Sequence, residues 1–416
     1  MNNQITPPQL PFRTEAVENA DITAAARTII LEGPICDNCL GRQFAKISSG
    51  LTNKKRGEIL RSVLDAELKE GTCWLCNGLF EHYDAWVLKA LETLKGYEFD
   101  SFLVGTKVNG MLLENEELLW EIAGAAHAEP LKAELNREVG KRIEQETGKI
   151  AEFDRPDLVV IINLVTEEVE LQINSVFIYG RYRKFKRGIP QTKWLCRECR
   201  GKGCGRCDFT GKMYPESVEE LIGGSILEEF GGVATVLHGS GREDIDARML
   251  GSGRPFVMEI KEPKLRELDL NRIEHKVNEE NKAKVEVLEL EYVKREAVAK
   301  TKNAKVDKTY RAVVSLKNDV LEDDLRSALD NLIGAVIEQR TPLRVAHRRA
   351  DLVRKRKVYD ARLVSFEVPI VEFKCDGGLY IKELISGDGG RTIPSLSKLL
   401  GTEAKVMELD VVDVAI

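Results

Sequence analysis

Residues 238–260 read H-G-S-G-R-E-D-I-D-A-R-M-L-G-S-G-R-P-F-V-M-E-I and follow a short apolar run at 233–237. A second apolar run, at 256–260, closes this stretch. Glycines and charged residues lie between the two runs, a pattern that predicts a strand, a glycine-rich loop and a second strand. The loop carries three acids and three arginines: Glu243, Asp244, Asp246, Arg242, Arg248 and Arg254.

A carboxylate flanked by arginines has two interpretations. A nearby opposite charge favours the ionised form of a carboxylate, which suits a nucleophile or an ion pair but not a proton donor. Salt-bridged turns are common, so the residues alone favour a structural role over a catalytic one.

The length of 416 residues predicts two or three domains, each able to bury a hydrophobic core. The chain has no apolar run as long as a membrane span and no secretory signal pattern, so we expect a cytoplasmic protein. Eight of the nine cysteines lie in C-x-x-C pairs, which favours metal binding over disulfides. The net charge of −6 argues weakly against a nucleic-acid partner, but the charges are unevenly distributed.

The first cysteine group lies in residues 1–83. Its two C-x-x-C pairs flank a segment, 59–68, whose apolar residues have helical spacing. Such pairs predict one tetrahedral zinc site, formed by Cys36, Cys39, Cys73 and Cys76. Four thiolates leave no open position, so this metal would be structural. Two unrelated pairs of buried thiols and an iron site are the alternatives.

Residues 84–180 read as a separate α+β unit. Helical patterns cover 86–94 and 116–147, with a break expected at Pro130. The apolar run 158–165 predicts a strand buried on both faces, and 169–173 alternates as a half-buried strand does. A further short strand is expected at 176–179.

The segment 180–194 is rich in cations and aromatics and has no acid. Cations neutralise phosphates and aromatics stack on unpaired bases, so RNA contact is one interpretation and a solvated linker is the other. The cations are Arg181, Arg183, Lys184, Lys186, Arg187 and Lys193; the aromatics are Tyr182, Phe185 and Trp194.

A second cysteine group follows within twelve residues: Cys196, Cys199, Cys204 and Cys207. The spacing predicts a second zinc site, although these pairs could instead share metal with the N-terminal cysteines. The cations of this segment would give it a basic surface: Arg197, Arg200, Lys202 and Arg206. The lone Cys375 is expected to be a buried apolar residue.

The C-terminal part reads as one large α+β domain. We expect helices at 218–230, 265–276 and 319–339, and strands at 285–292 and 308–316, the first of them with a bulge at 287–288. The chain contains no phosphate-binding G-x-x-x-x-G-K-[ST], no strand-borne G-x-G-x-x-G and no H-E-x-x-H, which argues against nucleotide-cofactor and zinc-protease chemistry.

Residues 339–359 carry eight fixed cations and one acid. Such a density repels itself unless it meets phosphate, so we prefer a track for an RNA backbone over a solvated face. The cations are Arg340, Arg344, Arg348, Arg349, Arg354, Lys355, Arg356 and Lys357.

Three motifs carry a family resemblance. The G-R-E-D of 241–244 resembles the G-R-T-D signature of TruA-type pseudouridine synthases. The longer G-R-E-D-I-D-A-R-M-L-G-S-G-R-P-F, the K-T-Y of 308–310 and the Y-I-K-E-L-I-S-G-D-G-G-R-T of 380–392 together resemble archaeal-type tRNA pseudouridine synthases of the Pus-ten branch, with a TruA/TruB-like core.

The resemblance implies a multidomain α+β protein. An N-terminal zinc unit would span 1–83 and a THUMP-like RNA-binding domain 84–180. A catalytic domain built on a mainly antiparallel sheet would span 181–416, with the second cysteine cluster at 196–207 inserted in it.

The resemblance also implies roles for individual residues. Asp244 would be the covalent nucleophile and Asp246 a structural acid. Tyr310 would pack against the flipped uracil and assist proton removal, and Lys382 would pair with Asp244. The other residues implied at the substrate are Tyr380, Arg242, Ile381 and Leu409.

The implied activity is isomerisation of uridines fifty-four and fifty-five in the T-loop of tRNA. The reaction would need no organic cofactor, and zinc would have structural roles only. The enzyme would be a monomer that does not bind membranes. The residues expected to contact RNA are Arg181, Arg183, Lys184, Lys186, Arg187, Arg344, Arg348, Arg349 and Arg354. A non-catalytic zinc-containing tRNA- or rRNA-binding factor is the alternative, and a tRNA thiolation enzyme or methyltransferase is disfavoured by the absent nucleotide motifs.

Overall fold

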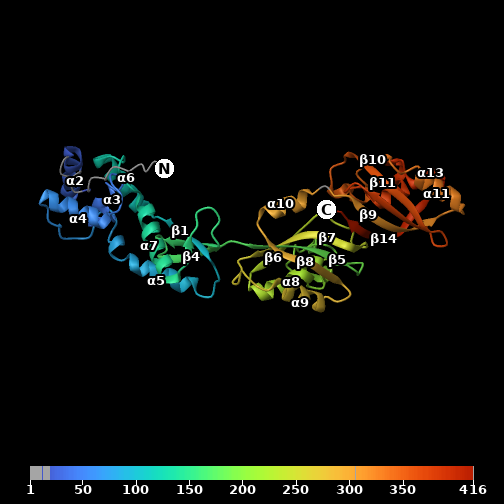
Figure 1. The fold of residues 1–416 in the computed structure, drawn as a ribbon, viewed down its shortest axis with the longest axis horizontal. Coiled ribbons are helices and arrows are strands. Elements are labelled where there is room, and N and C mark those ends of the chain that lie inside the picture. Colours follow the sequence, from blue (N-terminus) through green and yellow to red (C-terminus); the bar gives the residue numbers. More distant parts are fainter. Residues whose placement is uncertain (1–11, 13–18, 305, 416) are drawn as a thin grey trace, which may run out of the picture. The chain divides into compact units, whose positions relative to one another are not determined.

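The computed structural model describes residue 12, residues 19–304 and residues 306–415, without the side chain of Arg348. The chain divides into two compact units, Met1–Asn174 and Ser175–Ile416 (Figure 1). Among the described residues, no helix combines the length and the apolar character that crossing a bilayer requires.

The first unit begins with a small helical part. Its helices are α2 (Ala20–Glu32), α3 (Asp37–Arg42), α4 (Asn53–Leu64) and the short η1 (Leu79–Glu81). Helices α3 and α4 pack so closely that two glycines are required. A Cβ on Gly41 would lie 1.8 Å from the Asn53 carbonyl oxygen, and one on Gly57 would lie 2.1 Å from that of Asp37. This close packing brings the first cysteine pair toward the second.

A four-stranded sheet with helices completes the first unit. Its strands are β1 (Ser101–Lys107), β2 (Ile150–Ala151), β3 (Leu158–Asn163) and β4 (Glu168–Ile173), in the order β2-β1-β3-β4. Its helices are α5 (Tyr83–Leu94), α6 (Gly110–Ala123) and α7 (Leu131–Thr147). The predicted break at Pro130 is confirmed, since α7 starts directly after it. Strand β3 is fully buried on one face and half-buried on the other, so the prediction of two buried faces was too strong.

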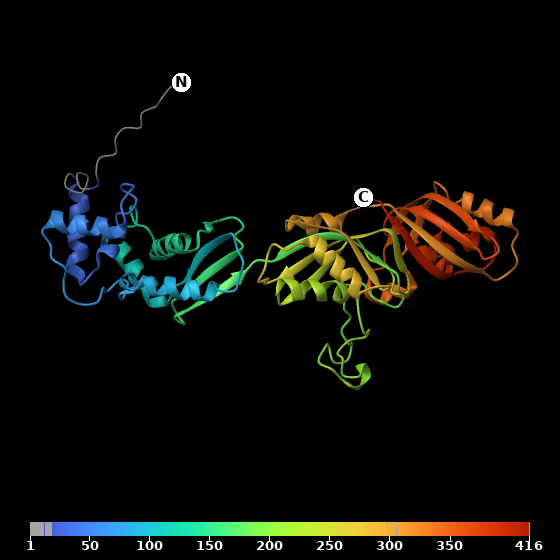
Figure 2. The ribbon, with the colours of Figure 1, turned by 60° about the horizontal axis from the view of Figure 1, so that its bottom comes forward.

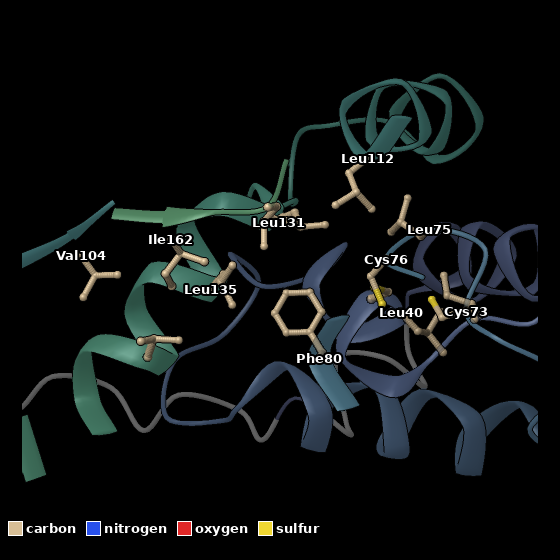
Figure 3. Close-up of a cluster of buried hydrophobic side chains, with 14 of the residues drawn as sticks. Leu40, Cys73, Leu75, Cys76, Phe80, Val104, Leu112, Leu131, Leu135 and Ile162 are labelled. Carbon is tan, nitrogen blue, oxygen red and sulfur yellow. The ribbon is translucent and has the colours of Figure 1, made fainter. Parts of the chain in front are cut away.

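One hydrophobic core runs through the whole first unit. Figure 3 shows Leu40, Cys76 and Phe80 of the cysteine-containing part beside Leu135 and Ile162 of the sheet-containing part. The predicted domain boundary at residue 83 therefore stays a prediction. The predicted boundary at 180/181 falls inside strand β5 (Val176–Lys184), and the break between compact units lies at 174/175.

The second unit is built on a ten-stranded sheet. Figure 1 labels β5 to β11 and β14 of this sheet. The path through it is β13-β10-β11-β12-β9-β14-β7-β5-β8, with β6 on β7. Its further strands are β6 (Ala234–Gly239), β7 (Arg248–Lys261), β8 (Val285–Val293), β9 (Lys308–Leu316), β10 (Val336–Arg340), β11 (Val353–Ser365), β12 (Ile370–Cys375), β13 (Thr392–Ile393) and β14 (Ala404–Val414). Its helices are α8 (Val218–Phe230), α9 (Leu270–Glu280), α10 (Glu296–Asn303), α11 (Glu322–Asp330), α12 (Ile381–Ser386) and α13 (Leu396–Leu400), with short η2 (Gly205–Cys207), η3 (Leu343–Arg348) and η4 (Asp388–Gly390).

The expected antiparallel character of this sheet is confirmed. Within the described residues, the pair β14–β7 is the parallel exception, with Asp410 opposite Arg248 and Val411 opposite Met249. The pair joins two halves of the unit, each with its own hydrophobic core. Tyr310 packs against both cores.

Two predicted helices differ from the structure. The helix expected at 319–339 ends at Asp330, and 336–340 forms strand β10. Gly334 adopts φ +76° and interrupts the helix, and Ile337 and Gln339 are buried in the alternating pattern of a strand. The helix expected at 265–276 begins later, at Leu270, where the Asp269 side chain caps it.

The bulge expected in β8 is present slightly farther along the strand. The register between β5 and β8 shifts opposite Gly180, and Glu289 takes the unusual φ of +57°. Gly180 permits this approach, because a Cβ there would lie 2.6 Å from Leu290 Cδ2.

Candidate active site

The loop that carries Asp244 is shorter than the sequence suggested. Strand β6 ends at Gly239 and β7 begins at Arg248, so the two later glycines lie in the strand and not in the loop. Gly251 has φ +61°, and a Cβ on it would lie 1.7 Å from the Val412 carbonyl oxygen. Gly251 lets β14 approach β7, which brings Leu409 toward the Asp244 loop.

A buried ionic network holds the loop that carries Asp244. Glu243 is 6% exposed, and its carboxylate accepts from Arg254 Nε at 2.8 Å and from the Tyr182 hydroxyl at 2.8 and 3.0 Å. Lys184 Nζ lies 3.6 Å from the same carboxylate. Burial alone would raise the pKa of Glu243, but Arg254 and Lys184 outweigh it and hold this pKa below its usual value. The residue before Asp244 is thus a fixed anchor.

The Asp244 carboxylate lies between two cations. Arg344 Nη1 donates to Oδ1 at 3.1 Å, and Nη2 lies 3.1 Å from Oδ2. Lys382 Nζ lies 3.6 Å from Oδ2. The other side of the Arg344 guanidinium is held by Glu383, with Nε to Oε1 at 2.6 Å. Burial would lower the pKa of Arg344, but these two carboxylates raise it overall, so its charge is secure.

The expected pairing of Lys382 with Asp244 is present, but Lys382 also has a second, closer carboxylate partner. Lys382 Nζ is in ion-pair range of Asp244, but its hydrogen bond goes to Asp246 Oδ2 at 2.6 Å. Burial would raise the pKa of Asp246, and Lys382 nevertheless brings it below the usual value. Arg344, predicted to contact RNA, makes the two-point contact with Asp244. Their sequence separation explains why motif spacing did not reveal this partner.

A cavity of about 430 Å³ opens directly on Asp244. The residues predicted at the substrate all line it: Arg242, Asp244, Tyr310, Tyr380, Ile381, Lys382 and Leu409. Tyr310 lies on β9, and burial raises the pKa of its phenol above its ordinary value, so the hydroxyl is neutral at physiological pH. Residues from four separate segments of the sequence therefore meet at one cavity.

Lys308 is a charged residue of the cavity that received no role from the sequence. Lys308, at the start of β9, is buried and lines the same wall as Tyr310. Burial and the nearby Arg254 lower its pKa to about 8. Gly241 leaves room for it, because a Cβ there would lie 2.8 Å from Lys308 Nζ. Its place in the K-T-Y triplet was the available signal.

The basic segment 180–194 is largely structural. Strand β5 lies between β7 and β8, so Arg181 and Lys184 are 7% and 0% exposed. The Arg181 side chain donates to the carbonyls of Ser252, Gly253 and Val414, and Lys184 donates to that of Ile189 at 2.9 Å. Both residues are satisfied inside the fold and cannot reach a phosphate, which corrects their predicted RNA contact.

The other predicted RNA contacts lie closer to solvent. Arg183 pairs with Glu286 at 2.9 Å, Lys186 lies 3.8 Å from Glu216, and Arg187 pairs with Glu408 and Asp410 at 2.8 Å. Arg349 and Arg354 line the cavity beside Asp244. The Arg348 side chain lies outside the described residues.

Each cysteine group is complete in itself. The Sγ atoms of Cys36, Cys39, Cys73 and Cys76 lie within 4.8 Å of one another, and so do those of Cys196, Cys199, Cys204 and Cys207. Several Sγ–Sγ separations are 3.7–3.8 Å. Four thiolates around one zinc at about 2.3 Å would be about 3.8 Å apart, so both donor sets fit that ion. Sharing of metal between the groups is not needed. Cys375 is buried in the core, as expected.

The comparisons with known proteins agree with this geometry. The family described as "Pus10, C-terminal" matches residues 177–415, and "Pus10 THUMP domain, archaeal" matches residues 86–163. The relative from Methanothrix thermoacetophila, named tRNA pseudouridine synthase Pus10, is 47% identical over 95% of this chain and 95% of its own.

Two other relatives carry the same name. The protein of Halorubrum lacusprofundi is 44% identical over 95% of this chain and 96% of its own. The protein of Methanocaldococcus jannaschii is 43% identical over 93% of each chain. With matches to both parts of the chain and relatives of the same extent, this protein belongs to the Pus10 family.

Proposed function

We propose that this chain isomerises uridine to pseudouridine in tRNA, with Asp244 as the covalent nucleophile. The observation that carries this proposal is the Asp244 carboxylate, held between Arg344 and Lys382 at the mouth of a cavity with tyrosine and aliphatic walls. A non-catalytic RNA-binding protein has no use for Asp244, Tyr310 and Lys382 gathered at one cavity. The matching relatives named tRNA pseudouridine synthase support the substrate class.

The reaction begins when the target nucleotide leaves the base stack. Extrusion costs a few kcal/mol and brings the nucleoside into the cavity. Asp244 then attacks the anomeric carbon of the ribose, and the bond from this carbon to N1 of uracil breaks. Because the carboxylate replaces the base covalently, one difficult exchange is divided into two easier steps. Arg344 holds both carboxylate oxygens, and so aims them before the substrate arrives.

The freed uracil rotates inside the cavity and rebonds through C5. The bond from the sugar to Asp244 breaks, the proton on C5 leaves, and N1 takes up a proton, so substrate and product are isomers. Ile381 and Leu409 wall the cavity and keep water from the glycosyl intermediate. Tyr310, neutral because its pKa is raised, packs against the base and offers a hydroxyl to it. Lys308, with a pKa of about 8, stands on the same wall and is suited to proton exchange near neutral pH.

We propose uridines fifty-four and fifty-five of the T-loop as targets, as the family resemblance implies. Two cations at the cavity, the exposed Arg349 and the half-buried Arg354, would contact the backbone on either side of the target. The first unit, which contains the THUMP match, would hold the body of the tRNA. The active site itself lies wholly within the second unit. A monomeric state and a cytoplasmic location stay predictions from the sequence.

Both cysteine groups are proposed to hold structural zinc. Four thiolates supply no open coordination position, so zinc would have no catalytic part in either place. Cys39, Cys73 and Cys76 are buried in the core of the first unit, where metal would contribute directly to folding. In the second group, backbone N–H groups of Cys204 and Gly211 outweigh desolvation and lower the pKa of Cys207 to about 7, which favours the metal-binding thiolate.

The test is incubation of the full chain with an unmodified tRNA transcript, followed by carbodiimide mapping of pseudouridine. Wild-type protein should form product in the T-loop. Asp244→Asn should lose at least about 10³-fold in rate and keep its tRNA affinity. Asp246→Asn is the matched control, since this neighbouring carboxylate touches Lys382 but does not line the Asp244 cavity.

Either of two results would overturn the proposal. If Asp244→Asn turned over at the wild-type rate, Asp244 would not be the nucleophile. Tight, salt-dependent binding of several tRNAs with no product would favour the RNA-binding factor without catalysis.

A further inference from the structure

A second cavity, of about 490 Å³, adjoins the first. The two have seven lining residues in common: Arg242, Glu243, Asp244, Arg344, Arg349, Tyr380 and Lys382. Trp194 and Tyr214 line only the second cavity. The active-site carboxylate and its two cations therefore form a shared wall between two adjoining spaces, one of which the proposed reaction does not use.

The outer wall of the second cavity is aromatic and cationic. The rings of Trp194 and Tyr214 meet edge to face, with centroids 5.6 Å apart. The Arg242 guanidinium lies over the Trp194 ring, with its central carbon 4.9 Å from the centroid. Both aromatic side chains are half-buried, and neither belongs to the two hydrophobic cores formed by the described residues of this unit. Core packing therefore does not account for them.

The second cysteine group determines where these two aromatics stand. Trp194 and Tyr214 are at the two ends of the loop that contains the cysteines, which projects from the unit (Figure 2). The Met213 amide donates to the Trp194 carbonyl at 2.9 Å, and the Cys196 amide donates to the Gly211 carbonyl at 2.8 Å. Leu195 and Lys212 form an antiparallel bridge between these contacts. The four thiols close the loop beyond them, so a metal there would hold the aromatic pair at the cavity.

We propose that Trp194, with Arg242 and Tyr214 behind it, stacks on the base of the nucleotide directly adjacent to the target uridine. The inference rests on the proposed function, because it takes the target to occupy the Asp244 cavity. An adjacent nucleotide is then within one backbone step of the second cavity. Unpaired bases stack on aromatic rings and guanidinium planes without regard to sequence. Arg349, exposed and common to both cavities, is placed for the phosphate between the two nucleotides.

Stacking of the neighbour would keep the target extruded. Without this platform the adjacent base would be left unstacked and mobile, so the target ribose would be held less firmly at Asp244. Trp194 is therefore a positioning residue, and its loss should affect the extruded state more than contacts to the tRNA body. The base-stacking scale predicts a fall in kcat/KM of about tenfold for Trp194→Ala.

The test uses tRNA with 2-aminopurine placed, in turn, on the 5′ and the 3′ side of the target. This base brightens when it leaves the RNA stack and is quenched when it stacks on indole. With the full chain at saturating concentration, Trp194→Ala should give emission several-fold above wild type from one of the two positions. Trp194→Phe keeps a stacking face and should retain most of kcat/KM. It also guards against a folding defect in the alanine variant.

Phe209→Ala is the matched control. Phe209 is an aromatic of the same projecting loop, is 79% exposed and does not line either cavity. It should leave emission and turnover as in wild type. Equal emission from wild type and Trp194→Ala at both positions would overturn the proposal, and so would a change confined to Phe209→Ala.

The same tRNAs distinguish this proposal from the proposed function. Product that depends on Asp244, with emission that does not depend on Trp194, would end the stacking proposal and leave the reaction intact. Trp194-dependent emission without any product would support the stacking contact and overturn the proposed reaction.

Discussion

Arg344 and Asp244, one hundred residues apart in sequence, meet through two contacts of 3.1 Å each, Nη1 to Oδ1 and Nη2 to Oδ2. Glu383 accepts from Nε of the same guanidinium at 2.6 Å. The planar fork of an arginine suits such a pair of contacts, which a lysine cannot reproduce. Arg344 thus orients the nucleophile, while Lys382 divides its charge between Asp244 and Asp246.

Replacement of Arg344 should therefore impair the chemical step. Arg344→Lys keeps a positive charge but cannot contact both Asp244 oxygens and Glu383, so we expect the single-turnover rate to fall about 10- to 100-fold. Affinity for tRNA, measured by filter binding, should change little. Arg349→Gln, which removes an exposed cation of the same cavity, is the control and should weaken binding instead. An Arg344→Lys variant with the wild-type rate would show that charge alone suffices.

The buried Glu243 should contribute strongly to stability. Glu243→Gln leaves Arg254 and Lys184 without their carboxylate partner in the interior, so the free energy of unfolding should fall by about 3 kcal/mol in urea. Glu291→Gln, at an exposed glutamate of β8, should stay within about 0.5 kcal/mol of wild type.

The same residue predicts how stability responds to acid. The folded-state pKa of Glu243 is depressed, so its contribution is complete above the unfolded pKa of about 4.3. The contribution is lost as the pH falls through the lower folded-state pKa. The stability difference between wild type and Glu243→Gln should therefore narrow in strong acid. A constant difference would argue against the ionised network.

Lys308 predicts a second pH dependence, at alkaline pH. Its pKa is about 8 in the folded protein and about 10.4 in an unfolded chain, so the unfolded state binds more protons between these values. The free energy of unfolding of wild type should rise relative to Lys308→Gln over this window, by up to roughly 3 kcal/mol. The exposed Lys398→Gln provides the control. If the difference in unfolding free energy between wild type and Lys308→Gln did not vary with pH, the pKa of Lys308 would not be lowered by folding.

The two cysteine groups should differ in what their metal supports. We expect about two zinc ions per chain, by thiol-reactive release, and about one in either Cys73→Ser or Cys199→Ser. Cys73→Ser should destabilise the first unit, because this group lies within its core. Cys199→Ser should leave the unfolding of that unit unchanged and alter the environment of Trp194. If the protein were purified without zinc and were as stable as the zinc-bound protein, both zinc sites would be contradicted.

Local patterns in the sequence carried much of the fold and the essential part of the site. Apolar spacing predicted the helix at 218–230, and the break at Pro130 follows from the missing amide of proline. The paired cysteines predicted two four-thiol groups. Three motifs, around Asp244, Tyr310 and Lys382, line one cavity as their family resemblance implied.

Tertiary structure alone decided the partners of these residues. A run of cations in the sequence does not show which side chains face inward, so Arg181 and Lys184 looked like RNA contacts until β5 took an inner place in the sheet. Arg344 belongs with Asp244 only because β10 and η3 bring the two segments together. Burial and ion pairing depend on distances between segments that are remote along the chain, whereas helices, turns and cysteine clusters depend on neighbours within a few residues. The sequence therefore determined which groups could react, and the packing of the sheet determined what holds them.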